Sequence, residues 1–478
     1  MKKIIYLLYF LLSIFMFNMK VGLNNISFII SLGLGLIFYS IFSKTSIKEE
    51  LSYKKNLTLK NKYFIYNIIY ILLIFILLGG LSYLLSLIIK IKYLGIINTF
   101  MTLMVFSLVI FKLINEYLEV SKYHKLNKVL NIYFHISNIL LSIISIILLK
   151  YVFKIDNYIN IIVLYSIPLF NTIIIFILLY IFILRKNNTK EKINIREIKN
   201  NLIKDRKITF YNIINAGYLY ISIIILYYVL SIRYNYNIKD ISIYITSLYF
   251  YGIIFIYYIS LLLKRIFRDR YILLENKILN KDKNIDNNFH SLINSIIKYS
   301  MGIVILLIVI SGPITNIFYR GEYNFIFDIV ILLFFYILYD IVIKLNILCN
   351  EKRFKLVILI GFFIGIIFEV PLIDSFYRMG YTLSFGGISS LVLGYTISVI
   401  LGFIFIYRKL KINFLNNFNN ILNIIYQNII LCLILVLFTF ILDVKSTNIW
   451  YSVINVIVYS LITIIYYIFI NKKSVGGK

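Results

Sequence analysis

Two pairs of oppositely charged residues stand four positions apart inside apolar stretches of the chain. They are Lys112 with Glu116, and Asp340 with Lys344. Four residues make about one helical turn, so the members of each pair can meet on one helix face. Charges inside apolar segments are expensive, and they commonly line water-filled cavities or ion pathways. Each pair is therefore either a self-neutralised helix end or a polar, ion-linked gating element that faces a cavity.

Two more basic residues lie where they could meet an anion. Lys298 stands in an apolar stretch, and its long side chain either reaches the membrane surface or meets an anionic group entering there. Arg320 follows the interrupted stretch SGPITNIFYR. It either ends a membrane span at the interface or contacts a ligand directly, so both lysine and arginine are candidate binding residues.

Prolines within apolar stretches indicate bends. Pro313 lacks a backbone N–H, and the adjacent Gly312 permits close packing at the bend, so the sequence predicts a kinked helix end there. Pro168 predicts a second kink in an earlier helix.

The residues that build enzyme and metal sites are scattered. His124, His135 and His290 form no H-E-x-x-H motif, and Cys349 and Cys432 have neither paired nor metal-type spacing. A phosphate-binding G-x-x-x-x-G-K-[ST] motif is also missing from the sequence. We therefore expect no catalytic site, no metal and no cofactor, and predict that the chain is not an enzyme.

The composition identifies an integral membrane protein. The chain has 478 residues, 61% of them hydrophobic, and a mean hydropathy of +0.90. Soluble proteins contain about 45–50% apolar residues. The formal net charge is +29, but the Lys and Arg sit mainly in short loops, where they set membrane orientation. Nucleic acid is therefore not an expected partner.

Apolar windows predict an all-α polytopic protein with about fourteen transmembrane helices. The predicted spans are 4–18, 25–43, 63–89, 94–118, 130–153, 158–184, 208–232, 241–263, 292–318, 324–348, 356–373, 381–407, 417–442 and 447–470. The termini and alternate loops on one side hold 36 of the 49 Lys and Arg, and the other side holds 10. This asymmetry predicts a multi-pass protein of the cell membrane with both termini in the cytoplasm.

A weak internal repeat organises these spans. Residues 114–147 and 342–373 share one layout, in which a helix ends in a short basic hairpin and a new helix returns at once. The offset is six helices, so equivalent helices keep their direction and the halves relate by a pseudo-twofold axis along the membrane normal. The predicted organisation is a six-helix lobe (1–185), a basic cytoplasmic linker (186–207), a second six-helix lobe (208–410) and two additional helices (411–478).

The region from 290 to 410 resembles the polysaccharide-exporter superfamily of flippases. This superfamily is related to multidrug and toxin extrusion transporters and includes the MurJ-like lipid II flippases, stage V sporulation protein B and the O-antigen flippases. The matching residues, in the order in which the family carries them, are Pro313, Phe318, Gly321, Glu322, Tyr323, Asn350, Lys352, Lys355, Gly386, Gly387, Gly394 and Tyr395. Their order and spacing carry the resemblance.

The resemblance implies a flippase that moves a polyprenyl-diphosphate-linked saccharide across the membrane by alternating access. That saccharide would be a polysaccharide repeat unit or a peptidoglycan precursor, and membrane lipids would be further partners. The alternatives are a cation-coupled multidrug efflux transporter of the same fold, with a coupling cation as partner, and a membrane-embedded polysaccharide polymerase or glycosyltransferase. The lipid II flippases carry cavity-facing arginines in their first two helices and in helix eight, and this chain has none within those predicted spans.

Overall fold

A computed structural model describes most of the chain. The described residues are 2–21, 25–42, 47–53, 57–89, 91, 93–154, 157–183, 206–280, 285–319, 325–349, 353–412, 415–442 and 448–475. Every regular element among them is a helix, so the predicted all-α class is confirmed. The chain forms two compact units, which are described separately below.

The first unit contains Met1–Ile224 and Tyr234–Thr246. Its helices are α1 (Lys2–Asn18), α2 (Ile26–Phe42), α3 (Lys48–Tyr53), α4 (Leu57–Ile89), α5 (Leu94–Val120), α6 (His124–Ile147) with the π-helical turn η1 (Leu148–Val152), α7 (Asn157–Phe182), most of α9 (Arg206–Tyr228), and α10 (Ile238–Thr246).

The second unit contains Ile225–Arg233 and Ser247–Lys478. It includes the π-helical turns η3 (Val229–Arg233) and η4 (Ser247–Gly252), followed by α11 (Ile253–Asn280), α12 (Ile285–Val309), α13 (Ser311–Tyr319), α14 (Phe325–Leu348), α15 (Phe354–Arg378), α16 (Leu383–Leu410), α17 (Leu415–Thr439) and α18 (Ile449–Val475). The units thus divide within α9 and after α10, whereas the predicted linker falls largely on residues 184–205, which lie outside the described part. The lobe boundaries stay a prediction.

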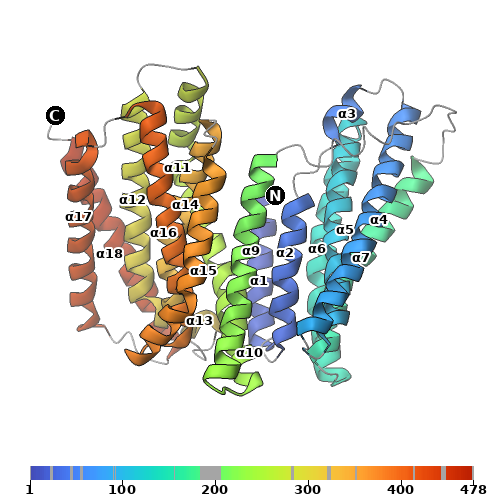
Figure 1. Cartoon of the computed structure of the whole chain (residues 1–478), viewed down its shortest axis with the longest axis horizontal. Helices are drawn as coiled ribbons and strands as arrows, with labels where there is room; N and C mark the ends of the chain where they lie inside the picture. The colour runs from blue at the N-terminus through green and yellow to red at the C-terminus, as the bar shows by residue number, and fades with distance from the viewer. Residues whose placement is uncertain are drawn as a thin grey trace. The chain divides into compact units, whose positions relative to one another are not determined.

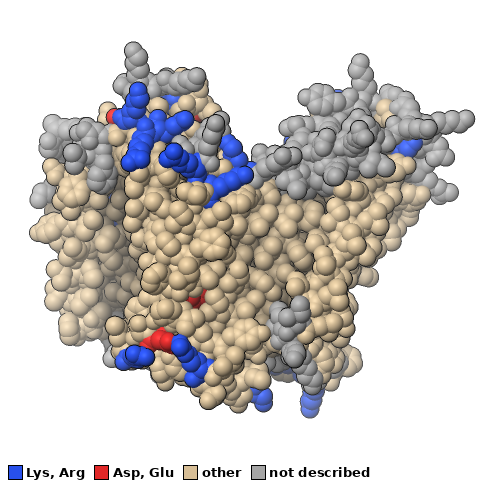
Figure 2. Space-filling model, in the orientation of Figure 1, with Lys and Arg blue, Asp and Glu red and all other residues tan. Residues whose placement is uncertain are grey.

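Helices coincide with all fourteen predicted spans. Among the described residues, twelve helices or continuous helical runs are long and apolar enough to cross a membrane, and the two shorter apolar helices α1 and α2 occupy the first two predicted spans. On the face shown in Figure 2, blue Lys and Arg side chains gather toward the ends of the helices, and the surface between them is almost entirely uncharged. Such a belt is what a bilayer requires.

One helix in each unit is surrounded by the others (Figure 1). α5 packs against α2, α4, α6 and α7, and its buried side chains lie on all sides of the helix. α14 packs in the same way against α11, α12 and α16. The sequence repeat pairs these two helices with each other.

Small residues bring α15 and α16 into close contact. A Cβ added at Gly361 would lie 2.4 Å from the backbone oxygen of Gly394 and 2.0 Å from Oγ of Ser398. A Cβ at Gly386 would lie 2.4 Å from Cα of Ile373. Close backbone approach of this kind is how membrane helices gain packing energy without a hydrophobic driving force.

The proline-containing helices differ from each other. The ninth predicted span is divided at Ile310 into α12 and α13, three residues before Pro313, and Gly312 lies in the first turn of α13. A proline removes one hydrogen bond to the preceding turn, which accounts for a break at this position. Helix α7, in contrast, continues through Pro168, and Thr172 Oγ1 donates to the carbonyl of Pro168 at 2.7 Å.

Helix α11 is longer than its predicted span. The sequence predicts a cytoplasmic loop from residue 264, but α11 continues to Asn280. Residues 264–280 contain three Leu, three Arg and two Lys, which favour helices. Phe267 and Leu274, two turns apart, are both buried and anchor it. Lys264 therefore lies within a continuous helix.

We predict that Gly361→Ala destabilises the second unit. The added methyl group meets the backbone of α16, and overpacking of this kind costs about 1–3 kcal/mol. Gly80→Ala is the matched control, because a Cβ there meets nothing within 4 Å. Thermal unfolding in detergent should show a lower midpoint for Gly361→Ala than for the control. Equal midpoints would show that the α15–α16 contact is not tight.

Candidate functional site

Asp340 is the buried centre of a charged cluster in the second unit. Its Oδ2 lies 2.7 Å from Nζ of Lys344, one turn later in α14, and 2.8 Å from Nζ of Lys264 in α11. The pair predicted from sequence is therefore present, but a second lysine shares its carboxylate. We call Lys264, Asp340 and Lys344 the lysine cluster.

Tyr336 completes the surroundings of Lys264. The ammonium group of Lys264 lies 5.0 Å from the centre of the Tyr336 ring, one turn before Asp340 in α14. The ring face attracts a cation, so Tyr336 and Asp340 together hold Lys264 against α14. This contact could not be predicted from the sequence, because Lys264 follows the predicted span 241–263 and was expected in a loop.

The lysine cluster carries an excess positive charge. Two ammonium groups face one carboxylate, and the lysines are more accessible than the acid. The side chain of Asp340 is 6% exposed, compared with 25% for Lys264 and 46% for Lys344. The cluster can therefore present N–H donors to an anion while Asp340 orients them from behind. Ammonium–phosphate hydrogen bonds are among the stronger polar contacts available to a protein.

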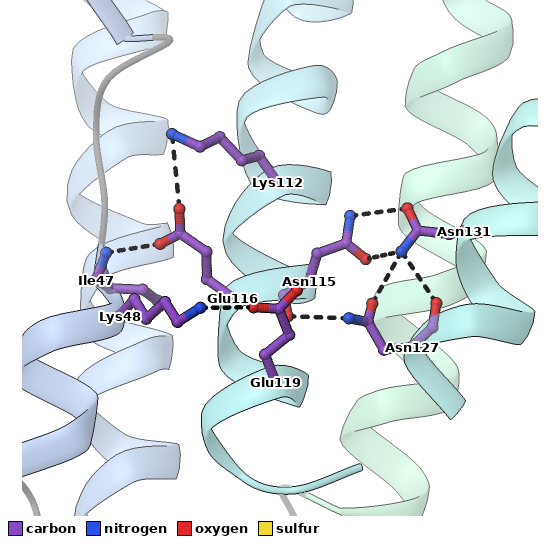
Figure 3. A network of polar contacts seen from close by, with 8 residues as sticks. All are labelled: Ile47, Lys48, Lys112, Asn115, Glu116, Glu119, Asn127 and Asn131. Atoms are coloured by element: carbon purple, nitrogen blue, oxygen red, sulfur yellow. Dashed lines mark hydrogen bonds and ion pairs between the residues drawn. The ribbon is translucent and has the colours of Figure 1, made fainter. Parts of the chain in front are cut away.

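The other predicted pair, in the first unit, is balanced by its neighbours (Figure 3). Nζ of Lys112 lies 3.6 Å from Glu116 Oε1, and the backbone N–H of Ile47 donates to Glu116 Oε2 at 2.8 Å. Lys48 pairs with Glu119 at 3.0 Å, and this hydrogen bond raises the pKa of the Lys48 ammonium. Glu116 and Glu119 thus fasten the start of α3 to the end of α5.

A group of asparagines beside these ion pairs connects α5 to α6. Nδ2 of Asn131 donates to the Oδ1 of Asn115 and of Asn127, both at 3.0 Å, and Nδ2 of Asn115 donates back to Asn131. The whole network around Glu116 is internally satisfied. It has the features of a structural joint between α3, α5 and α6.

Lys298 also has partners within the protein. Its Nζ donates to Asn471 Oδ1 of α18 at 2.8 Å and lies about 6 Å from the rings of Tyr299 and Tyr467. The Tyr467 hydroxyl donates to the backbone oxygen of Lys298 at 2.9 Å and also lies 2.8 Å from Asn428 Oδ1 of α17. Lys298 therefore connects α12 to the two additional helices.

A further ion pair, which sequence analysis did not anticipate, lies elsewhere in the second unit. Arg233 in η3 forms an ion pair with Asp374 of α15, and Thr382 donates to Asp328 at 3.1 Å. Arg320, the remaining predicted binding residue, lies outside the described residues. Within the described part of the chain, no three His, Cys, Asp or Glu side chains are arranged to hold a metal ion.

Comparison with known proteins identifies the fold. No protein-family model and no curated protein sequence matches the chain. A solved structure titled "Lipid II flippase MurJ, inward closed conformation" matches with a TM-score of 0.66 and 16% identity, covering 99% of this chain and 98% of that one. An inward-facing multidrug resistance transporter of the MATE family and MOP superfamily matches with a TM-score of 0.50 and 12% identity, covering 85% and 94%. The chain has the fold of these membrane flippase and transporter structures.

We predict that Asp340→Asn lowers the free energy of unfolding of the second unit by about 2–3 kcal/mol. Removing one partner of a wholly buried ion pair costs about 3–5 kcal/mol, and the cost is smaller here because the lysines are partly exposed. The substitution leaves two ammonium groups facing each other without a counter-charge. Asp328→Asn, which alters an acid held by a hydroxyl, is the control.

The test is a comparison of thermal unfolding midpoints in detergent. Adding Lys264→Met to Asp340→Asn should recover part of the loss, because one of the two repelling charges is gone. If Asp340→Asn unfolds like Asp328→Asn, or if the second substitution restores nothing, the two lysines do not depend on Asp340.

Proposed function

We propose that this protein is a flippase that moves a polyprenyl-diphosphate-linked saccharide across the cytoplasmic membrane by alternating access. The lysine cluster is the observation that carries the proposal. A diphosphate is the feature shared by lipid-linked saccharides, whatever sugar they bear, and the cluster offers two ammonium groups backed by one carboxylate. Its location in membrane-spanning helices suits a ligand that must pass through the bilayer.

The ratio of two lysines to one aspartate in the cluster suits transport as well as binding. A transporter must release its ligand, so its site has to bind an anion reversibly. Asp340 holds both lysines when no anion is present and competes with the phosphate oxygens when one arrives. The bound phosphate and the Asp340 carboxylate then share the ammonium groups of Lys264 and Lys344, which lowers the affinity of the cluster for the phosphate.

The position of Lys264 bears on the resemblance to lipid II flippases. Those proteins carry a cavity-facing arginine in helix eight, and the span predicted for that helix here, 241–263, contains none. The helical run that corresponds to predicted helix eight contains Lys264, because α11 extends past the predicted end of the span. We infer that Lys264 supplies the cation of helix eight.

The charges of the first unit favour this function over cation-coupled drug efflux. That alternative calls for an acidic residue available to a cation deep in the first lobe. The acid predicted within its spans, Glu116, pairs with Lys112 and accepts the Ile47 N–H.

The two additional helices support a lipid-linked substrate. α17 packs on α12, and α18 packs on α13, while most of their apolar side chains face outward. We infer that the polyprenyl tail stays in the bilayer beside α17 and α18 while the saccharide crosses.

The proposal is tested with the purified chain in vesicles that contain a fluorescent polyprenyl-diphosphate saccharide. Lys264→Gln and Lys344→Gln should each raise the half-saturating substrate concentration about tenfold or more, because each removes a charge-assisted hydrogen bond worth about 1.5–3 kcal/mol. Lys264→Arg should keep most of the activity. Lys112→Gln is the matched control from the balanced pair of the first unit and should change transport little.

The measurement is the fraction of labelled saccharide reached by a membrane-impermeant quencher over time. A folded double variant, Lys264→Gln with Lys344→Gln, that transports like the parent would contradict the assigned role of the cluster. Transport of a cationic dye instead of the lipid by the parent chain would favour drug efflux.

A further inference from the structure

Helices α6 and α7 of the first unit form a groove that the proposed function does not use. It has a volume of about 500 Å³. Its lining residues come from α6, η1 and α7, and they include Ile144, Ser145, Leu148, Ser166, Ile167 and Phe170. Both helices belong to membrane spans, so the groove lies within the apolar belt.

Small residues between larger ones create this space. Ser145 and Ser166 line the groove, and Ile167 beside them is buried. Larger side chains stand at the surface around them, with Ile144 50% and Phe170 60% exposed. The π-helical turn η1 begins at Leu148, which is itself one of the lining residues.

The groove offers an almost purely apolar lining. The hydroxyl of Ser145 donates to the carbonyl of Ser142 at 3.0 Å, and that of Ser166 donates to the carbonyl of Val163 at 2.7 Å. Both serine protons are therefore used within their own helices, and the remaining lining atoms are mostly carbon. Burying apolar surface is the chief interaction that such a site can offer a ligand.

The occupant can be inferred from the groove's surroundings and size. The groove opens on a face whose neighbouring exposed residues, Leu140, Ile147 and Ile177, are apolar, so it is continuous with the surface that faces lipid. One water molecule occupies about 30 Å³ in the liquid, and a methylene group is of similar size. The groove volume of about 500 Å³ therefore corresponds to about 15 to 17 methylene groups. That is the size of one phospholipid acyl chain, and a polyprenyl tail is several times larger.

A lysine stands at the loop end of the groove. Lys154 follows Leu148 by six residues and is exposed, whereas the nearby Lys150 donates to the backbone oxygen of Met19 at 2.7 Å. An exposed ammonium at the membrane surface attracts a phosphate head group. We propose that the α6–α7 groove binds one acyl chain of an anionic phospholipid, whose phosphate lies near Lys154. This site is independent of the proposed transport function.

The single tryptophan of the chain makes the site measurable. In a Trp450→Phe background, Phe170→Trp places a fluorescent reporter at the groove. Ile177→Trp places a matched reporter on the same helix, similarly exposed but outside the groove. The full chain is reconstituted in phosphatidylcholine with an increasing fraction of phosphatidylglycerol that carries bromine, a quencher, on its acyl chain.

The groove reporter should reach half-quenching at a brominated fraction at least threefold lower than the control reporter, because a binding site concentrates the lipid. Brominated phosphatidylcholine should be less effective, and Lys154→Gln should remove this head-group preference. Filling the groove with Ser145→Leu and Ser166→Leu should make the quenching curves of the two reporters coincide. Coincident curves in the unfilled chain would overturn the site, and equal quenching by both lipids would overturn the assignment of Lys154.

Discussion

Hydrocarbon leaves no water to satisfy a polar group, and this constraint shapes every level of the protein. Backbone N–H and C=O groups must pair within the chain, so the described spans are helices. Several polar side chains within the described spans also find partners inside the protein. Asn294 and Asn417 exchange hydrogen bonds at 2.8 Å between α12 and α17, and the buried Asp340 pairs with two lysines. At the lysine cluster the pairing leaves one positive charge over, and this excess is the basis of the proposed anion site.

The two units use similar residues differently. In the first unit, Glu116 pairs with Lys112 and also accepts the backbone N–H of Ile47, so its carboxylate joins α3 to α5. In the second unit, Asp340 pairs with two lysines, Lys344 from its own helix and Lys264 from α11. Lys298, which sequence analysis also considered as a binding residue, instead joins α12 to α18. Within the lysine cluster, two ammonium groups thus share one carboxylate, whereas Glu116 and Lys298 each join neighbouring helices.

The spans could be predicted from sequence because hydropathy over about 20 residues is set by the thickness of the bilayer. The break at Ile310 was anticipated from Gly312 and Pro313, since proline acts on its own helix. Partners distant in sequence could not be predicted. Lys112–Glu116 and Asp340–Lys344 look alike as four-residue pairs, and only the packing of α11 on α14 brings Lys264 to Asp340. The same holds for Lys298, whose partner Asn471 lies 173 residues away.

The central claim is that the chain carries a diphosphate-linked lipid across the membrane. Its most direct test is to deplete the protein in the cell that encodes it and to quantify every polyprenyl-diphosphate-linked saccharide in the membrane. One such intermediate should accumulate several-fold, with its saccharide on the cytoplasmic side, and restoring the parent chain should clear it. Unchanged levels of all these intermediates after depletion, with a loss of drug resistance instead, would contradict the account.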